Sequence, residues 1–544
     1  STGSAQNDTR YKGHGAGGSI YLSAASVAGS GSITAAGYGF DSSWQRPGGA
    51  GGRIAVICTT AESLSFPTTN LMCNGSIASY GNTTGAGTIF VKTASQQNGT
   101  LIVDNAFAGA NFEAFWPTKR GVTPIPAGET WTLDEIQFRR CGVLCVPEGT
   151  TLAVPLSGIS SSSDRTAGIL YEGGTLNIGS APYTLTGKWT FQADAPYTFN
   201  GDVTVTGGAN IGGLRFSGNY TNDFAKCDVT VNGDLTIASD GYASATMAGP
   251  VEANKNGGAF PRHGGQYASL SGNKCYGSVF DPMLPGYFAQ AGDHATAGVG
   301  GGVLKLTVTG DLVVDGSVTA NSAVFSHSSA AAGSVSITAK TLSGNGSVTA
   351  NGAVGSIQWD NGYNGVGGRI AVRVTGEDVG TTGVWTKFAA RGCATNQVAT
   401  TNERNQNSSA GTIYLQGKSD GEKGGTIYVK NQASYDTSNV ATWLPAGMLG
   451  DDVKDFAKSK LVIADRGVVS VGTNNLAFAS ISIAENSKID LNGKIVKVKK
   501  AYLNGVSLGA GEYTADNSAV TGYVVDSVGG GKLIVGGGFS VVVR

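Results

Sequence analysis

Short runs of alternating apolar and polar residues, mostly bounded by glycine, recur along the chain. Clear examples lie at residues 174–178, 183–186, 202–205, 228–231, 304–308 and 312–314. Alternation with a period of two turns one set of side chains toward a core and the other toward solvent, which indicates β-strands. One stretch, Asp451 to Lys460, instead begins with acidic residues and ends with lysines, which predicts the only helix. The pattern predicts an all-β protein.

The chain carries one series of motifs twice. The paired segments are 17–24 and 332–339, 29–35 and 344–350, 51–56 and 367–372, 87–91 and 411–415, 99–103 and 425–429, and 142–146 and 467–471. The first four offsets are 315, 315, 316 and 324, so the two repeats stay nearly in register. Two nearly identical strands, Gly316–Asn321 and Gly346–Asn351, are also 30 residues apart. Short strands at such spacing indicate the stacked rungs of a parallel β-helix, or β-solenoid.

These repeats predict four parts: a first solenoid module at 1–156, connecting rungs at 157–255, a second module at 256–480 and a small β cap at 481–544. The second module has an extra leading segment, which runs from His263 through Tyr276 to Val308. Because the first module lacks this segment, we expect it to begin part-way through. Either a longer precursor is cut, or another chain supplies the missing edge.

The glycine-rich segments Gly51–Val56 and Gly367–Val372, the strand Gly316–Asn321 and the end segments Gly511–Ala515 and Gly531–Val535 carry a resemblance. They look like large secreted bacterial β-solenoid repeat proteins of the adhesin and autotransporter-passenger kind. The tail is similar to that of autotransporter-associated β-strand repeat proteins. The resemblance implies a right-handed parallel β-helix on the outside of a bacterial cell, and it transfers no catalytic residue.

Composition narrows the classes of function. Glycine contributes 85 of 544 residues, about twice its usual share, while charged residues make up 14% and the net charge is −1. Without a basic stripe we expect no nucleic-acid partner. No apolar run of about 18 residues is present, so no membrane span is predicted. Seven cysteines without a CxxC pair argue against zinc and favour buried thiols, with one or more disulfides as the alternative.

Candidate catalytic and metal-binding residues each have a structural interpretation. His14, His263, His294 and His327 show no spacing with carboxylates that would indicate a site. The cluster Asp451, Asp452 and Asp455 fits a helix N-terminus as well as a sugar or calcium site. Arg53 and Arg369 follow Gly-Gly in both repeats, which favours a structural contact such as donation to loop carbonyls. We therefore predict no catalytic residue, metal or cofactor.

Two groups of residues are candidates for binding. Exposed aromatic side chains in polar or glycine-rich loops can stack on sugar rings, or else pack against the solenoid; these are Tyr11, Trp44, Tyr80, Trp359 and Tyr363. The apolar end of the chain is a candidate for strand pairing with a neighbouring molecule, through Phe539, Val541, Val542 and Val543.

The sequence thus predicts an extracellular structural protein that assembles head to tail with itself as a surface fibre, sheath or adhesin. Extracellular polysaccharide is a further expected partner. The alternatives are a polysaccharide-active β-helix enzyme, which requires a groove lined by carboxylates, and a non-catalytic glycan-binding module.

Overall fold

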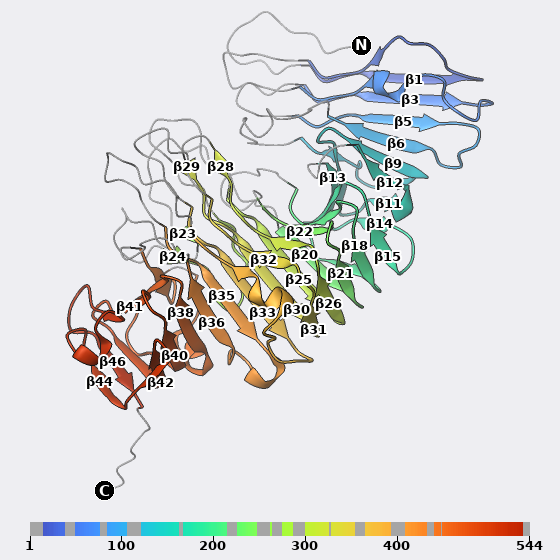
Figure 1. Cartoon of the computed structure of the whole chain (residues 1–544). Helices are drawn as coiled ribbons and strands as arrows, with labels where there is room; N and C mark the ends of the chain where they lie inside the picture. The colour runs from blue at the N-terminus through green and yellow to red at the C-terminus, as the bar shows by residue number, and fades with distance from the viewer. Residues whose placement is uncertain are drawn as a thin grey trace, which may run out of the picture. The chain divides into compact units, whose positions relative to one another are not determined.

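The structure is a computed structural model. It describes residues 15–38, 49–76, 84–105, 121–162, 167–214, 226–246, 262–263, 275–286, 300–325, 328–353, 365–392, 408–431, 440–447 and 449–536. The chain forms two units: an N-terminal unit of Ser1–Ser244 with Val251–Ala253 and Asp315–Ser317, and a C-terminal unit of the remaining residues. Strands dominate both units, and most of them pair in parallel (Figure 1). The predicted all-β parallel solenoid is confirmed, while the four domain boundaries stay a prediction.

The N-terminal unit begins with a six-stranded sheet in the order β1-β3-β5-β6-β9-β12. Its strands are β1 (Ser19–Ala24), β3 (Arg53–Cys58), β5 (Thr88–Lys92), β6 (Thr100–Asp104), β9 (Glu135–Arg139) and β12 (Ile159–Ser161). The other strands of this unit form further rungs of the solenoid. They are β2 (Ile33–Thr34), β4 (Leu71–Met72), β7 (Thr123–Pro124), β8 (Thr130–Thr132), β10 (Val143–Pro147), β11 (Thr151–Ala153), β13 (Gly168–Glu172), β14 (Thr175–Asn177), β15 (Tyr183–Leu185), β16 (Thr190–Ala193), β17 (Tyr197–Phe199), β18 (Val203–Val205), β19 (Asn210–Ile211), β20 (Lys226–Val231), β21 (Leu235–Ile237) and β22 (Tyr242–Ser244).

The C-terminal unit contains a long sheet in the order β25-β30-β33-β35-β36-β38-β40-β42-β46-β44. Its strands are β25 (Val303–Val308), β30 (Ser334–Ala339), β33 (Arg369–Val374), β35 (Thr412–Gln416), β36 (Thr426–Lys430), β38 (Lys460–Ala464), β40 (Leu476–Ile483), β42 (Ile495–Leu503), β44 (Gly511–Tyr513) and β46 (Lys532–Val535). The remaining strands after residue 244 are short. They are β23 (Arg262–His263), β24 (Cys275–Tyr276), β26 (Asp311–Val314), β27 (Ser317–Thr319), β28 (Val324–Phe325), β29 (Ser328–Ser329), β31 (Thr341–Ser343), β32 (Ser347–Thr349), β34 (Phe388–Ala389), β37 (Thr442–Leu444), β39 (Val468–Val471), β41 (Lys488–Asp490), β43 (Val506–Leu508) and β45 (Val524–Val525).

Equivalent apolar residues of successive rungs stack directly above one another. Leu461 in β38 pairs with Ile481 in β40, which pairs with Ala501 in β42, so each coil here takes 20 residues. All three side chains are fully buried. Such ladders align one buried position per coil, and the alternate positions face outward.

The pairing direction changes once within the first sheet, at the antiparallel hairpin of β5 and β6. Phe90 lies opposite Leu101 across this hairpin, so both side chains share a face of the sheet. Before the hairpin the buried cluster lies on the other face and includes Ile54 and Ile89. After it, Leu101 and its parallel partner Ile136 are buried instead. The hairpin reverses the direction of the strands that follow it. Because the connections between parallel strands keep the same handedness, the coils after the hairpin return over the opposite face of the sheet. The core therefore lies on the other side of the sheet from this point on.

The second repeat contains the same hairpin at the equivalent place. β35 pairs antiparallel with β36, with Tyr414 opposite Ile427, while β33–β35 and β36–β38 are parallel. Tyr414 and Ile427 share one buried cluster with Leu461. The motifs recognised twice in the sequence therefore encode the same change of pairing direction twice.

The repeated glycines permit close approach of neighbouring coils. A Cβ atom at Gly51 would lie 1.8 Å from the Cys73 carbonyl oxygen, and one at Gly367 would lie 2.2 Å from that of Ala390. Both distances are far inside van der Waals contact, so only glycine fits these positions. This explains why Gly-Gly precedes the arginine in both repeats.

The predicted helix at Asp451–Lys460 is a short 3₁₀-helix, η5 (Val453–Lys458), with Asp452 at its N-cap. It is not the only helical segment, which corrects the sequence prediction. The other 3₁₀-helices are η1 (Thr68–Asn70), η2 (Leu156–Gly158), η3 (Gly383–Thr386), η4 (Lys418–Asp420) and η6 (Ser518–Val520). Each spans three or four residues at a bend, a length that leaves no hydrophobic periodicity to detect.

Candidate functional site

Most residues that the sequence singled out for binding lie outside the described residues. This applies to the predicted assembly residues Phe539, Val541, Val542 and Val543, and to the aromatic residues Tyr11, Trp44, Tyr80, Trp359 and Tyr363. His14, His294 and His327 lie outside them as well. Their proposed roles stay predictions.

Residues 275–286, here called the covering segment, lie over one face of strands β30, β33 and β35. Arg369 in β33 is fully buried beneath it. The Nε and Nη2 atoms of Arg369 donate to the carbonyl oxygen of Tyr276, at 3.2 and 3.1 Å, and Nη1 donates to Oγ1 of Thr412 at 3.0 Å. The contact of this arginine is structural, as predicted, but its acceptor is a carbonyl oxygen of the short strand β24 and not of a loop.

Further donors from the same sheet bind later parts of the covering segment. The hydroxyl of Ser334 in β30 donates to the carbonyl oxygen of Leu284 at 2.6 Å. Arg373 in β33 donates from Nη2 to the carbonyl oxygen of Phe280. Three side chains of two neighbouring strands thus bind backbone carbonyls of the segment, and such contacts hold a peptide largely independently of its side chains.

Side chains of the covering segment complete the core next to this sheet. The Phe280 ring packs edge-on against Tyr414 at 4.9 Å between centroids and lies 5.2 Å from Phe456. Val279 and Phe280 are buried, and Asp451 accepts a hydrogen bond from the Val279 amide at 2.7 Å. The segment therefore covers the end of the buried apolar cluster that continues from the hairpin of β35 and β36 toward the C-terminus.

Burial also acts on the charge of Arg369. Loss of hydration lowers the pKa of its guanidinium, while the nearby Cys275, Asp451 and Tyr276 side chains oppose that shift. Burying a cation is less costly when its nitrogens donate hydrogen bonds, and each of the three guanidinium nitrogens of Arg369 donates one here. The contact is therefore specific, because any segment that covers Arg369 must place a backbone carbonyl oxygen at this position.

In the first repeat, no segment among the described residues covers the equivalent sheet face. The strand registers make the following positions equivalent: Ser19 and Ser334, Arg53 and Arg369, Thr88 and Thr412, Tyr21 and Ser336, Ala55 and Ala371, Phe90 and Tyr414, and Ile57 and Arg373. Arg53 is exposed, and its side chain makes no hydrogen bond to a described residue, so the predicted structural contact is not found at this arginine. Tyr21 is 68% exposed. We call this the open face of β1, β3 and β5.

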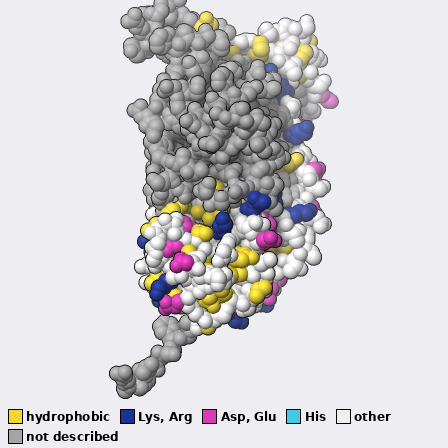
Figure 2. All heavy atoms as spheres, turned by 60° about the vertical axis from the view of Figure 1, so that its left-hand side comes forward, with side chains coloured by type: hydrophobic (Ala, Val, Ile, Leu, Met, Phe, Trp, Pro, Cys, Tyr) yellow, Lys and Arg dark blue, Asp and Glu magenta, His cyan; other side chains and the backbone are white. Residues whose placement is uncertain are grey.

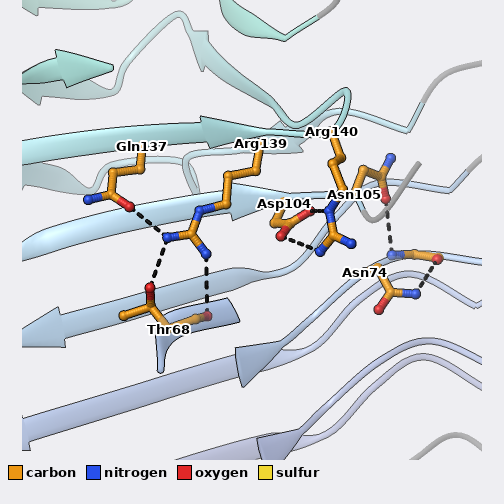
Figure 3. A network of polar contacts seen from close by, with 8 residues as sticks. Thr68, Asn74, Asp104, Asn105, Gln137, Arg139 and Arg140 are labelled. Carbon is orange, nitrogen blue, oxygen red and sulfur yellow. Dashed lines mark hydrogen bonds and ion pairs between the residues drawn. The ribbon is translucent and has the colours of Figure 1, made fainter. Parts of the chain in front are cut away.

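A polar network joins coils on the same unit (Figure 3). Arg140 points toward Asp104 and donates from Nε and Nη2 to its carboxylate, at 2.8 and 2.5 Å. Arg139 donates from Nη2 to Oγ1 of Thr68 at 2.9 Å and to Oε1 of Gln137 at 2.7 Å. The hydrogen bond to Asp104 raises the pKa of Arg140, which keeps it charged. These pairs connect strands to loops.

A second part of this network recurs in both repeats. Asn105 accepts from the Gly75 amide at 3.1 Å and donates to the Thr84 carbonyl oxygen at 3.2 Å. Asn431, at the same place after β36, accepts from the Gly392 amide at 3.0 Å and donates to the Ser408 carbonyl oxygen at 3.1 Å. Both side chains are buried. Each asparagine joins the two ends of one loop, the loop between β4 and β5 in the first repeat and the loop between β34 and β35 in the second.

The predicted carboxylate cluster does not converge on one site. Asp451 binds the covering segment, Asp452 pairs with Lys454 at 3.4 Å, and Asp455 pairs with Lys423 at 2.8 Å. Within the described ranges, no group of three His, Cys, Asp or Glu side chains has the geometry to hold a metal ion. The structural interpretation of this cluster is the one that the contacts support.

The cysteines of the described region are buried thiols. They are Cys58, Cys73, Cys141, Cys145, Cys227 and Cys275, and none forms a disulfide. Burial raises the pKa of Cys73 to about 12, and it raises the pKa of Cys145 as well, aided by a hydrogen bond to Glu172. A thiol with so high a pKa is a poor nucleophile. The prediction of buried thiols is confirmed for these six; Cys393 lies outside the described residues.

In the part of the chain that the structure describes, no helix has the length and apolar character to span a membrane. The chain matches no protein-family model, and comparisons with curated proteins and with solved structures gave no match.

The covering segment was visible in the sequence only as an extra stretch before the second repeat. Its role was missed because nothing in its composition marks it as a binding element.

Proposed function

We propose that this protein is an extracellular structural protein, the subunit of a self-assembling surface fibre or sheath or an adhesin, which pairs end to end through its strands. The observation that carries the proposal is the six-residue strand β1 at the edge of the first sheet. Among the described residues, β1 pairs only with β3. A long edge strand offers unpaired amide and carbonyl groups to a strand of another molecule.

The other end of the solenoid is closed more tightly. There β46 pairs in parallel with β42 and antiparallel with β44, so the described edge is the three-residue strand β44. Residues 537–544 follow β46, and their apolar sequence suits addition to the β1 edge of another molecule. Contacts between two different ends repeat without closure and give a filament.

The surface of the C-terminal unit also supports a structural role. Figure 2 shows lysine and arginine side chains interspersed with acidic ones on its described part, together with apolar patches. Interspersed charges produce no strong field of one sign. Such a surface suits lateral contacts in an assembly better than it suits a polyanionic ligand.

Deletion of residues 537–544 tests this proposal. We expect the shortened protein to keep its far-UV circular dichroism and its unfolding midpoint but to remain in discrete particles by electron microscopy. The matched control replaces the same eight positions with glycine and serine, which keeps the length and removes the apolar side chains. Filaments formed by the deleted protein would overturn the proposal.

One observation favours glycan binding as a second candidate. A pocket of 260 Å³ in the N-terminal unit is lined by polar side chains that include Glu62, Gln96 and Gln137, with Val91 and Ile102 beside them. Amide and carboxylate groups suit sugar hydroxyls, but none of the lining residues is aromatic, so the pocket provides no ring for stacking. Weakened binding of an oligosaccharide by Gln137→Ala, on a glycan array followed by titration, would favour this candidate.

A further inference from the structure

The open face of the first repeat retains the groups that bind the covering segment in the second. Ser19, Arg53 and Thr88 form one row across β1, β3 and β5. The equivalent row in the second repeat has the same three residue types, Ser334, Arg369 and Thr412. There the serine and the arginine donate to carbonyl oxygens of the covering segment. The first row therefore carries the same hydrogen-bond donors in the same order, with nothing from the described residues bound to them.

The next positions of the open face are more apolar than their equivalents. Tyr21 stands where the second repeat has Ser336, and Ile57 stands where it has Arg373. Ala55 and Phe90 are half-buried, and Tyr21 is 68% exposed. A tyrosine, an alanine and a phenylalanine thus lie side by side on a sheet surface next to an exposed arginine. Exposed apolar surface beside a polar anchor is characteristic of a protein-binding site.

We propose that the open face of β1, β3 and β5 binds a peptide segment of a partner protein in the manner of the covering segment, which bends at Gly277 after the short strand Cys275–Tyr276. A backbone carbonyl of the partner accepts from Arg53, and an aromatic side chain about four residues further on packs against Phe90, as Phe280 packs against Tyr414. Because Ile57 replaces Arg373, the partner has an apolar side chain where the covering segment presents the Phe280 carbonyl. This site is separate from the β1 edge used in the proposed assembly.

The energetic argument follows from the second repeat. In the second repeat Arg369 is completely buried, and each of its three guanidinium nitrogens donates one hydrogen bond, two to the Tyr276 carbonyl and one to the Thr412 hydroxyl. Charge-assisted hydrogen bonds of this kind are stronger than neutral ones, and they lose strength when lysine replaces the planar guanidinium. Arg53 is therefore the anchor, and the aromatic contact near Phe90 supplies most of the buried apolar surface.

A peptide with the sequence of residues 275–286, with serine in place of Cys275 and a fluorophore at its end, serves as the probe. We expect saturable binding to the full chain with one site per molecule, followed by fluorescence anisotropy. Arg53→Ala should weaken binding at least tenfold and Arg53→Lys by less. Lys497→Ala, which removes an exposed cation from β42, is the matched control and should leave binding unchanged. A peptide with Phe280→Ala should bind at least tenfold more weakly.

A tethered version removes any dependence on weak affinity. The same peptide joined through a flexible glycine-serine linker before Ser1 has a millimolar effective concentration. We expect this fusion to raise the unfolding midpoint of the protein, and Arg53→Ala to abolish the increase. Equal binding to the wild-type protein and Arg53→Ala, or a fusion without any effect, would overturn the proposal. Displacement of the probe by a peptide of residues 537–544 would assign the face to another molecule of this protein and would overturn the assignment to a distinct partner.

Discussion

Arg53 and Arg369 occupy equivalent positions of the two repeats, in strands of two different sheets, yet Arg369 is fully buried and Arg53 is exposed. The difference comes from residues 275–286, whose Tyr276 carbonyl oxygen lies 3.2 Å from Nε of Arg369. The same residue, at the same position of the repeated strand, is thus exposed in one repeat and buried in the other. The burial of Arg369 therefore comes from the covering segment and not from the repeated strands.

Substitution of these two arginines should therefore have unequal effects. Arg369→Ala leaves the Tyr276 carbonyl without its donor and opens a cavity, so we expect a loss of about 3 kcal/mol in the free energy of unfolding. Arg53→Ala, the matched control, should change it by less than about 0.5 kcal/mol. Guanidinium unfolding followed by circular dichroism measures both. Equal effects would show that the covering segment does not stabilise the second repeat.

The two buried asparagines should behave alike. Asn105→Ala and Asn431→Ala each remove two hydrogen bonds to backbone groups at the two ends of one neighbouring loop, so each should cost about 2 kcal/mol. Asn232, whose amide is exposed and donates to Asn200, provides the control, and its alanine variant should stay within about 0.5 kcal/mol of wild type. Loss of stability in only one repeat would contradict their equivalence.

The close approach of coils at Gly51 and Gly367 predicts that neither tolerates alanine. The added Cβ would lie 2.3 Å from a backbone nitrogen in each case, in addition to the carbonyl contact. We expect either variant to lose at least about 2 kcal/mol or to fail to fold. Gly31 has no atom within 4 Å of such a Cβ, so Gly31→Ala should express and unfold like wild type. A stable Gly51→Ala protein would show that the coils separate easily.

The buried cysteines predict slow thiol chemistry. Burial raises the pKa of Cys73 and of Cys227 to about 12, so only about one thiol in ten thousand is ionised at pH 8. Because the pKa is raised, reaction with Ellman's reagent should remain slow between pH 7 and pH 9 and become complete only in guanidinium. Titration of the native protein with Ellman's reagent should show at most one rapidly reacting thiol per chain. Several rapidly reacting thiols per chain at pH 8 would contradict the burial of the six described cysteines.

Much of the fold follows from local sequence signals. Alternation with glycine boundaries predicts strands such as Leu304–Val308, and the offset between repeats predicts their equivalence, because both depend on residues close together in the chain. The change of core face at Phe90 and Leu101 could not be predicted, since an antiparallel hairpin and a parallel rung use the same strand pattern. The contact of Arg369 with Tyr276 was also out of reach, because the two residues are 93 positions apart.

The proposed end-to-end assembly is tested most directly by electron microscopy of the purified full chain over a range of concentrations, without added ligand. We predict filaments with a regular axial repeat that lengthen as the concentration rises. Discrete single rods at every concentration would contradict the account and would leave the protein as a monomeric solenoid.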